Sequence, residues 1–162
     1  MNNTWQLVPW ATAMYAGDRE WWDRYGAECT FPGERWTRDP HATLRYRLKR
    51  VVGGNGAGLC TCPGRVHLGG NSGYQAVNLA FHFGAREIVL LGFDMHRQNG
   101  GHWHGEHEGM LSAPERHLPV WRRAFDALAH DLAARGVRVT NATPGSALQC
   151  FPRGDLWSAL RC

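Results

Sequence analysis

The chain has 162 residues, enough for one domain with its own core and few for two. Hydrophobic residues make up 43% and charged residues 20%, which excludes a disordered, collagen-like or coiled-coil protein. The formal net charge is +4, but the basic residues of the chain are spread along its whole length. A nucleic-acid binder is therefore not favoured, and a phosphorylated small molecule fits equally well. No apolar run reaches the roughly 20 residues of a membrane span and no signal peptide is evident, so we expect a cytoplasmic protein.

The cysteines do not predict a disulfide framework. There are five, an odd number, and they are scattered except for Cys60 and Cys62. One residue separates that pair, whereas zinc knuckles usually have two or more, so we expect reduced thiols in a loop.

The N-terminal part predicts a strand followed by a helix. Residues 11–17 are small and apolar, as in a short buried strand, and Asp18 is typical of the N-cap of a helix that stops at Gly26. Asp18 then follows a strand end, which in parallel α/β sheets faces the ligand, although capping alone explains it equally well. Residues 43–52 alternate as a strand does, and the glycine-rich segment 53–70 predicts a loop over the sheet edge.

The clearest helix of the chain begins near residue 71. Asn71 or Ser72 caps it, its apolar positions follow helical spacing, and Gly84 ends it. Free backbone amides meet a hydroxyl and a carboxamide at this helix start, and Gly73 has no side chain to block an anion. We therefore expect a seat for phosphate or carboxylate there.

The remaining elements alternate between strand and helix. Residues 88–91 predict a buried strand, and Asp94 follows at its carboxyl end. Apolar residues at spacings of three and four predict a long amphipathic helix over about 115–135. A last strand over 137–144 and a short helix in the tail 151–162 complete the order. The order predicts one three-layer α/β domain with a mainly parallel, Rossmann-like sheet.

The segment GGHWHGEHEG, residues 100–109, concentrates chemistry in a loop. It holds His102, His104 and His107 with two glutamates, soon after Asp94. Three hypotheses remain open: a metal site, a general base with an imidazole pKa of about 6.5, and a solvated polar loop. The spacing argues against metal, because no single regular backbone aligns all three imidazoles. A loop after a strand end, opposite the amide-rich helix start, favours function over a mere turn.

Several motifs, in this order, resemble the bacterial sialyltransferases that modify lipooligosaccharide. Asn-Ser-Gly at 71–73, the helix, the strand IVLLG and then Asp94 resemble SG…A…LG…I.L.G.D, and HWHGEHEG before a long helix resembles HY.GH. NATPGSAL resembles CPNSLL, and the N-terminal NNTWQLVPWATAMYAGDREWW is similar to an Asn followed by a strand ending in Asp. The pattern is similar also to motility-accessory glycosyltransferases and to a group of uncharacterised phage proteins.

The resemblance implies a protein of bacterial or phage origin that binds a nucleotide-activated sugar such as a CMP-sugar. It assigns residues 71–73 to the nucleotide part of the donor, and Asn2 or Asn3 to its phosphate or ribose. The residues implied near the donor are Asn2, Asn3, Asp18, Asn71, Ser72, Gly73 and Ser146.

The resemblance also implies a catalytic base. His107 would deprotonate an acceptor hydroxyl, with His104 and His102 as rivals because the spacing differs by one residue. Those sialyltransferases need no metal.

The chain also departs from the family pattern. The family opens with a strand and a glycine-rich GNGPSL turn that holds the donor phosphates, and this chain starts after that place, so we expect the first βα unit to be missing. The paired tyrosines expected to support the leaving phosphate are absent too, with Tyr74 alone in the central region. These departures are compatible with a truncated product, pairing with another chain or a homo-oligomer, or loss of transfer.

Two alternatives therefore stay open beside the transferase. One is a non-catalytic phage binding or assembly protein on the same fold. The other is a metal-dependent hydrolase built on Asp94 and the histidines His102, His104 and His107.

Overall fold

The computed structural model describes residues 1–96 and 114–159 and is a mixed α/β structure with short parallel strands. These ranges form three small sheets, each with its strands in parallel. They are β1 (Ala13–Tyr15), β2 (Glu34–Thr37) and β3 (Lys49–Arg50); β4 (Val52–Gly54) and β5 (Arg65–His67); and β6 (Glu87–Leu90) and β7 (Arg138–Asn141). The predicted α/β class is confirmed.

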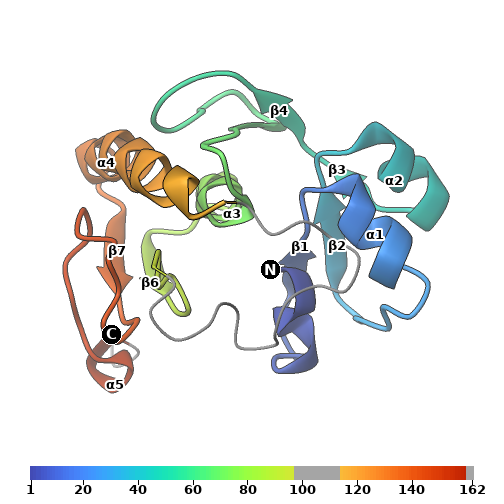
Figure 1. The fold of residues 1–162 in the computed structure, drawn as a ribbon, viewed down its shortest axis with the longest axis horizontal. Coiled ribbons are helices and arrows are strands. Elements are labelled where there is room, and N and C mark those ends of the chain that lie inside the picture. Colours follow the sequence, from blue (N-terminus) through green and yellow to red (C-terminus); the bar gives the residue numbers. More distant parts are fainter. Residues whose placement is uncertain (97–113, 160–162) are drawn as a thin grey trace.

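The helices pack around these sheets, and α3 lies between the two groups of elements. In the described ranges they are the 3-10 turn η1 (Asn2–Gln6), α1 (Arg19–Tyr25), α2 (Pro40–Tyr46), α3 (Ser72–His82), the 3-10 turn η2 (Glu115–His117), α4 (Leu118–Ala134) and α5 (Leu156–Ala159). Figure 1 shows β6 and β7 with α4 on the left, β1 to β3 with α1 and α2 on the right, and α3 between them. None of the helices in these ranges is long and apolar enough to cross a membrane.

Helix α3 packs against two separate cores because apolar residues lie on more than one of its faces. Tyr74 and Val77 belong to a core shared with α4 and the β6–β7 sheet, in which Phe125 and Leu128 are fully buried. Leu79 belongs to a smaller core with residues from β1 and β5. A third core holds Trp21 and Trp22 of α1, beneath the N-terminal sheet. The start of α3 is therefore held by packing on both sides.

Most predicted elements are confirmed, and two predictions are wrong. The glycine-rich segment 53–70 is not a loop throughout, because it contributes to the parallel pair β4–β5. The helices predicted around residues 18–26, 71–84 and 115–135 correspond to α1, α3 and α4, and the strand predicted after α3 is β6, of which Leu90 alone is buried. Residues 43–52 do not form one strand, because α2 covers their first part.

Helix α2 forms because its capping residues favour a helix at both ends. The carboxylate of Asp39 accepts a hydrogen bond from the amide of Ala42 at 2.8 Å, and Pro40 occupies the first turn, where a missing amide costs nothing. Arg47, with φ of 53°, ends the helix in the left-handed region. These capping signals outweigh the alternating pattern of the side chains.

The glycine-rich segment is held by one buried side chain of α3. The carboxamide oxygen of Asn78 accepts from the amides of Cys60 (3.0 Å) and His67 (3.2 Å), and its nitrogen donates to the carbonyl of Cys60 (2.9 Å). Asn78 has no exposed surface. This side chain replaces the strand pairing that the segment on either side of Cys60 lacks.

Replacing Asn78 by Leu should therefore lower the free energy of unfolding by about 3 kcal/mol, because three buried backbone groups lose their partner. Urea unfolding followed by circular dichroism measures this change. Asn55→Ala, at an exposed position of the same glycine-rich segment, is the matched control and should change stability little. Equal effects of both substitutions would contradict the assignment.

Candidate functional site

The candidate site lies where β1 and β2 end and α3 begins. In the parallel pair β1–β2, Tyr15 is opposite Trp36, so both strands end at the same edge. Gly17 follows β1 and is packed closely: a Cβ atom there would lie 2.9 Å from Oε1 of Gln75 and 3.3 Å from Oγ of Ser72. The absence of a side chain at position 17 lets the strand end approach the first turn of α3.

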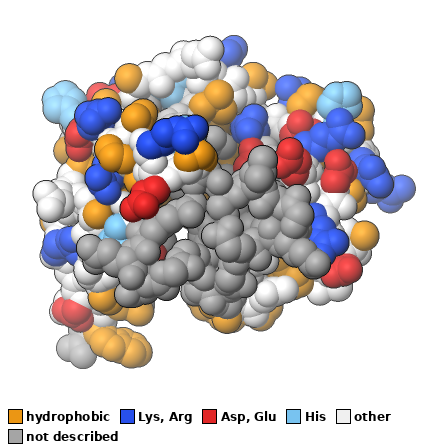
Figure 2. Space-filling view, viewed as in Figure 1, with side chains coloured by type: hydrophobic (Ala, Val, Ile, Leu, Met, Phe, Trp, Pro, Cys, Tyr) orange, Lys and Arg blue, Asp and Glu red, His pale blue; other side chains and the backbone are white. Residues whose placement is uncertain are grey.

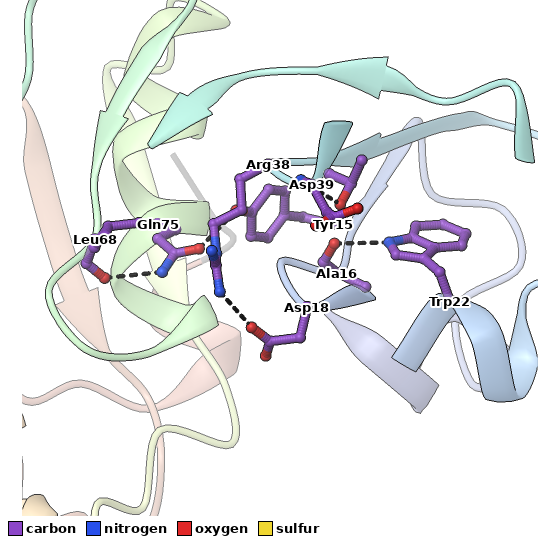
Figure 3. A network of polar contacts seen from close by, with 9 residues as sticks. Tyr15, Ala16, Asp18, Trp22, Arg38, Asp39, Leu68 and Gln75 are labelled. Carbon is purple, nitrogen blue, oxygen red and sulfur yellow. Dashed lines mark hydrogen bonds and ion pairs between the residues drawn. The ribbon is translucent and has the colours of Figure 1, made fainter. Parts of the chain in front are cut away.

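A buried hydrogen bond joins this strand end to α3. The hydroxyl of Tyr15 donates to Oε1 of Gln75 at 2.6 Å, and Nε2 of Gln75 donates to the carbonyl of Leu68 at 2.9 Å (Figure 3). Burial raises the pKa of Tyr15 well above its ordinary value, with the nearby Arg38 acting in the opposite direction. Tyr15 therefore remains a neutral donor at physiological pH.

The first turn of α3 presents unpaired donors. Asn71 is the N-cap, and its side-chain oxygen accepts from the amide of Tyr74 at 2.9 Å. Within the described residues, no acceptor pairs with the amides of Ser72 and Gly73, and no group pairs with the Ser72 hydroxyl. Amides of this kind, at the positive end of a helix, bind anions.

An ion pair closes the edge beside this turn. Nη2 of Arg38, which follows β2, lies 2.5 Å from Oδ1 of Asp18, which follows β1 (Figure 3). Asp18 is at the N-cap position of α1 as predicted, but its side chain makes no capping hydrogen bond. The two side chains are 35% and 54% exposed. An ion pair this open to solvent stabilises a fold by about 0 to 1 kcal/mol, so Arg38 is held weakly.

The chain leaving β6 runs beside the same helix start. A Cβ atom on Gly73 would lie 2.9 Å from the ring of Phe93, so this ring packs against Gly73. The hydroxyl of Ser146 donates to the carbonyl of Phe93 at 2.5 Å, and the amide of Ala147 donates to the carbonyl of Asp94 at 2.7 Å. Asp94 itself is exposed. The loop after β7 thus sets the path of the segment that leads toward residue 97.

One residue farther along, the backbone is in an uncommon conformation. Met95 has φ of 55°, in the left-handed region that costs a side-chain-bearing residue roughly 1 kcal/mol or more. Nη1 of Arg122 on α4 donates to its carbonyl at 2.9 Å. The turn that directs the chain away from Asp94 is therefore held from α4.

The structure brings some of the predicted site residues together and assigns structural contacts to others. Ser72 lies against Gly17, which Asp18 follows in the chain, whereas Gly73 lies against Phe93 and Asn71 is used as a helix cap. The remaining residues have separate surroundings. Asn3 accepts from the indole of Trp21 at 2.8 Å, Asn2 has a buried side-chain oxygen without a partner in the described ranges, and Ser146 is buried among hydrogen bonds. The predicted bases His102, His104 and His107 lie outside the described residues.

Arg38 lies at the candidate site, and the sequence patterns did not predict it there. The signal was present in the sequence: Asp39-Pro40 marks a helix start, so the preceding ERWT is placed as a strand and Arg38 at its carboxyl end. Weak periodicity between residues 27 and 70 hid that strand.

The described residues contain no group of three or more histidine, cysteine or acidic side chains arranged to hold a metal ion. Cys60 is buried and its backbone is bound by Asn78, while Cys62 is exposed. The described cysteines Cys29, Cys60, Cys62 and Cys150 are free thiols.

Charge is interspersed over the helices nearest the site. Asp23 contacts Arg19 at 3.0 Å and Arg45 at 3.5 Å. On the face drawn in Figure 2, basic and acidic side chains lie next to each other over the right of the molecule, around α1 and α2. The positive charge of α1 and α2 is therefore partly compensated by neighbouring carboxylates.

Comparison with known proteins identifies no relative: no family model, no curated protein and no solved structure matches the chain.

The tyrosine in the first turn of α3 predicts a loss of stability at alkaline pH. Burial raises the pKa of Tyr74 to about 12, and its hydroxyl donates to the carbonyl of Gly58 at 2.6 Å. The unfolded chain loses this proton at about pH 10, so the contribution of Tyr74 is complete below pH 10 and disappears as the pH rises to about 12.

Urea unfolding at about pH 9 and about pH 11 should show this decline, of about 1 to 2 kcal/mol over that interval. Tyr74→Phe should be less stable at the lower pH, because the hydrogen bond is lost, and should decline less steeply. A variant with the same pH slope as the parent protein would rule out this role for Tyr74.

Proposed function

We propose that this protein is glycosyltransferase-like and binds a nucleotide-activated sugar at the carboxyl edge of β1 and β2, with a CMP-sugar as the first donor to test. A histidine of residues 100–109, His107 in the first instance, would act as the base toward an acceptor hydroxyl. We place this activity in the cytoplasm of a bacterial or phage-infected cell.

The observation that carries the proposal is the first turn of α3. The hydroxyl of Ser72 borders the strand end at Gly17, and neither it nor the amides of Ser72 and Gly73 have a partner among the described residues. Anionic ligands of parallel α/β proteins bind at such edges, where helix starts and carboxyl strand ends meet. The chain after Asp94 leaves from the same edge, which supports a base delivered from residues 100–109.

The order of the strands supports a Rossmann-like sheet without its first βα unit. Figure 1 shows β7, β6, β1 and β2 in sequence across the view, with no strand pairing between β6 and β1 in the described ranges. In a Rossmann order the first strand lies between the second and the fourth. If β1 and β2 correspond to the second and third strands, and β6 and β7 to the fourth and fifth, the first strand of that order would lie between β1 and β6.

Two substitutions test donor binding at the edge. Gly17→Ala puts a methyl group against Gln75, Tyr15 and Ser72, and should weaken CMP binding by about tenfold or more, because it forces the strand end away from the first turn of α3. Ser72→Ala removes one neutral hydrogen bond and should weaken it by about fivefold. Isothermal titration calorimetry measures both effects.

Gly54→Ala is the matched control, since its Cβ atom would lie no closer than 3.8 Å to any neighbour. It should bind CMP as the parent protein does. If the parent protein binds no nucleotide or nucleotide sugar, the proposed function is wrong.

The base assignment is tested by hydrolysis of a CMP-sugar donor in the absence of acceptor. His107→Ala should abolish hydrolysis while CMP binding persists, whereas His104→Ala should retain it, because one imidazole activates the attacking oxygen. His41→Ala, at an exposed position on α2, controls for a general effect of removing a histidine. The reverse pattern would transfer the assignment to His104.

A further inference from the structure

Arg38 has more hydrogen-bonding capacity than the described structure uses. Its Nη2 contacts Asp18, while its Nε is buried and has no partner among the described residues. Buried polar groups without partners are rare in native proteins, and a guanidinium has five donors that match the oxygens of a phosphate. The described contacts therefore use only part of the hydrogen-bonding capacity of this guanidinium.

The position of Arg38 places it between two sets of donors. In Figure 3 its side chain runs past Gln75 and Tyr15 and ends at Asp18. Gln75 and Ser72 both lie within contact distance of the space at Gly17, next to Asp18 in the chain. The guanidinium thus lies by Gln75 and Asp18, and Gln75 and the Ser72 hydroxyl both border the position next to Asp18 in the chain (Figure 3).

Asp18 is the acidic side chain that the described contacts place against this guanidinium. Because both side chains are partly open to solvent, their pairing contributes little to stability. A phosphate carries more charge than a carboxylate and offers three oxygens, so it can compete for the same guanidinium.

We propose that Arg38 is the phosphate-binding residue of this edge, and that Asp18 is its counter-ion in the unliganded protein, displaced when a phosphoryl group is bound. That the ligand is a nucleotide rests on the proposed function, whereas the binding of a phosphoryl group by Arg38 does not depend on it. Asp18 thereby sets the affinity, since every bound phosphate must first compete with it.

Calorimetric titrations with CMP and with inorganic pyrophosphate test this proposal on the purified chain. Arg38→Gln should weaken both ligands by about tenfold or more, and Arg38→Lys by less, because it keeps the charge but loses the fork. Asp18→Asn should strengthen both by a few-fold, since the competing carboxylate is gone. An increase in affinity cannot arise from misfolding, so this variant keeps the test decisive even if Arg38→Gln is unstable.

Arg86→Gln is the matched control. Arg86 is exposed and lies just before β6, at the amino end of that strand. The substitution therefore removes the same charge at a position away from the proposed site. It should leave both affinities unchanged.

The outcomes separate this inference from the proposed function. Pyrophosphate binding that depends on Arg38, without CMP binding, would support the phosphate site and contradict the nucleotide-sugar proposal. CMP binding that is unaffected by Arg38→Gln and Asp18→Asn would overturn the role of Arg38 and leave the nucleotide proposal standing. If the parent protein binds neither ligand, both are wrong.

Discussion

The hydrogen bond from Tyr15 to Gln75 joins a strand of the N-terminal sheet to helix α3, and the arrangement of the site depends on it. The β1–β3 and β6–β7 sheets share no strand pairing within the described residues, so α3 bridges them through its side chains. Burial keeps the Tyr15 hydroxyl protonated, and Gly17 allows the close approach that the 2.6 Å bond requires. A strand end and a helix start are thereby held at one edge.

The same helix links the site to the rest of the molecule. Tyr74 packs edge-to-face on Phe125 of α4, with ring centroids 5.3 Å apart, while Asn78 ties down the glycine-rich segment one turn later. The donors of the first turn thus stand on an element whose buried side chains reach three neighbouring parts of the fold. Preorganised donors bind an anion without the cost of ordering them first.

The sequence predicted those parts of the fold whose signals are local and repeated. Helix α3 has a cap at Asn71 and apolar residues at helical spacing, and α4 has the same spacing over a longer run, so both were recognisable without tertiary information. Helix α2 was missed because a short alternating pattern competed with the Asp39-Pro40 start. Short segments carry too few residues for periodicity to decide between helix and strand.

The sequence predicted the helix start of the candidate site, but it did not predict the ion pair between Arg38 and Asp18. Ser72 and Gly73 follow from the helix signal alone, since a helix start always leaves amides unpaired. The ion-pair partner of Asp18 could not be predicted from local sequence, because Arg38 lies twenty positions away. Local reasoning assigned Asp18 to a cap, and the ion pair across the strand ends took its side chain instead.

The indoles of Trp21 and Trp22 lie next to the carboxyl end of β1 and can report on it spectroscopically. Trp22 donates from its ring nitrogen to the carbonyl of Ala16 at 2.8 Å, one residue before Gly17 (Figure 3). Its ring meets that of Trp21 at 4.9 Å and 88°, a geometry in which neighbouring aromatic transitions couple. Since both rings are buried, the near-ultraviolet dichroism of this pair senses small displacements of the strand end without an added label.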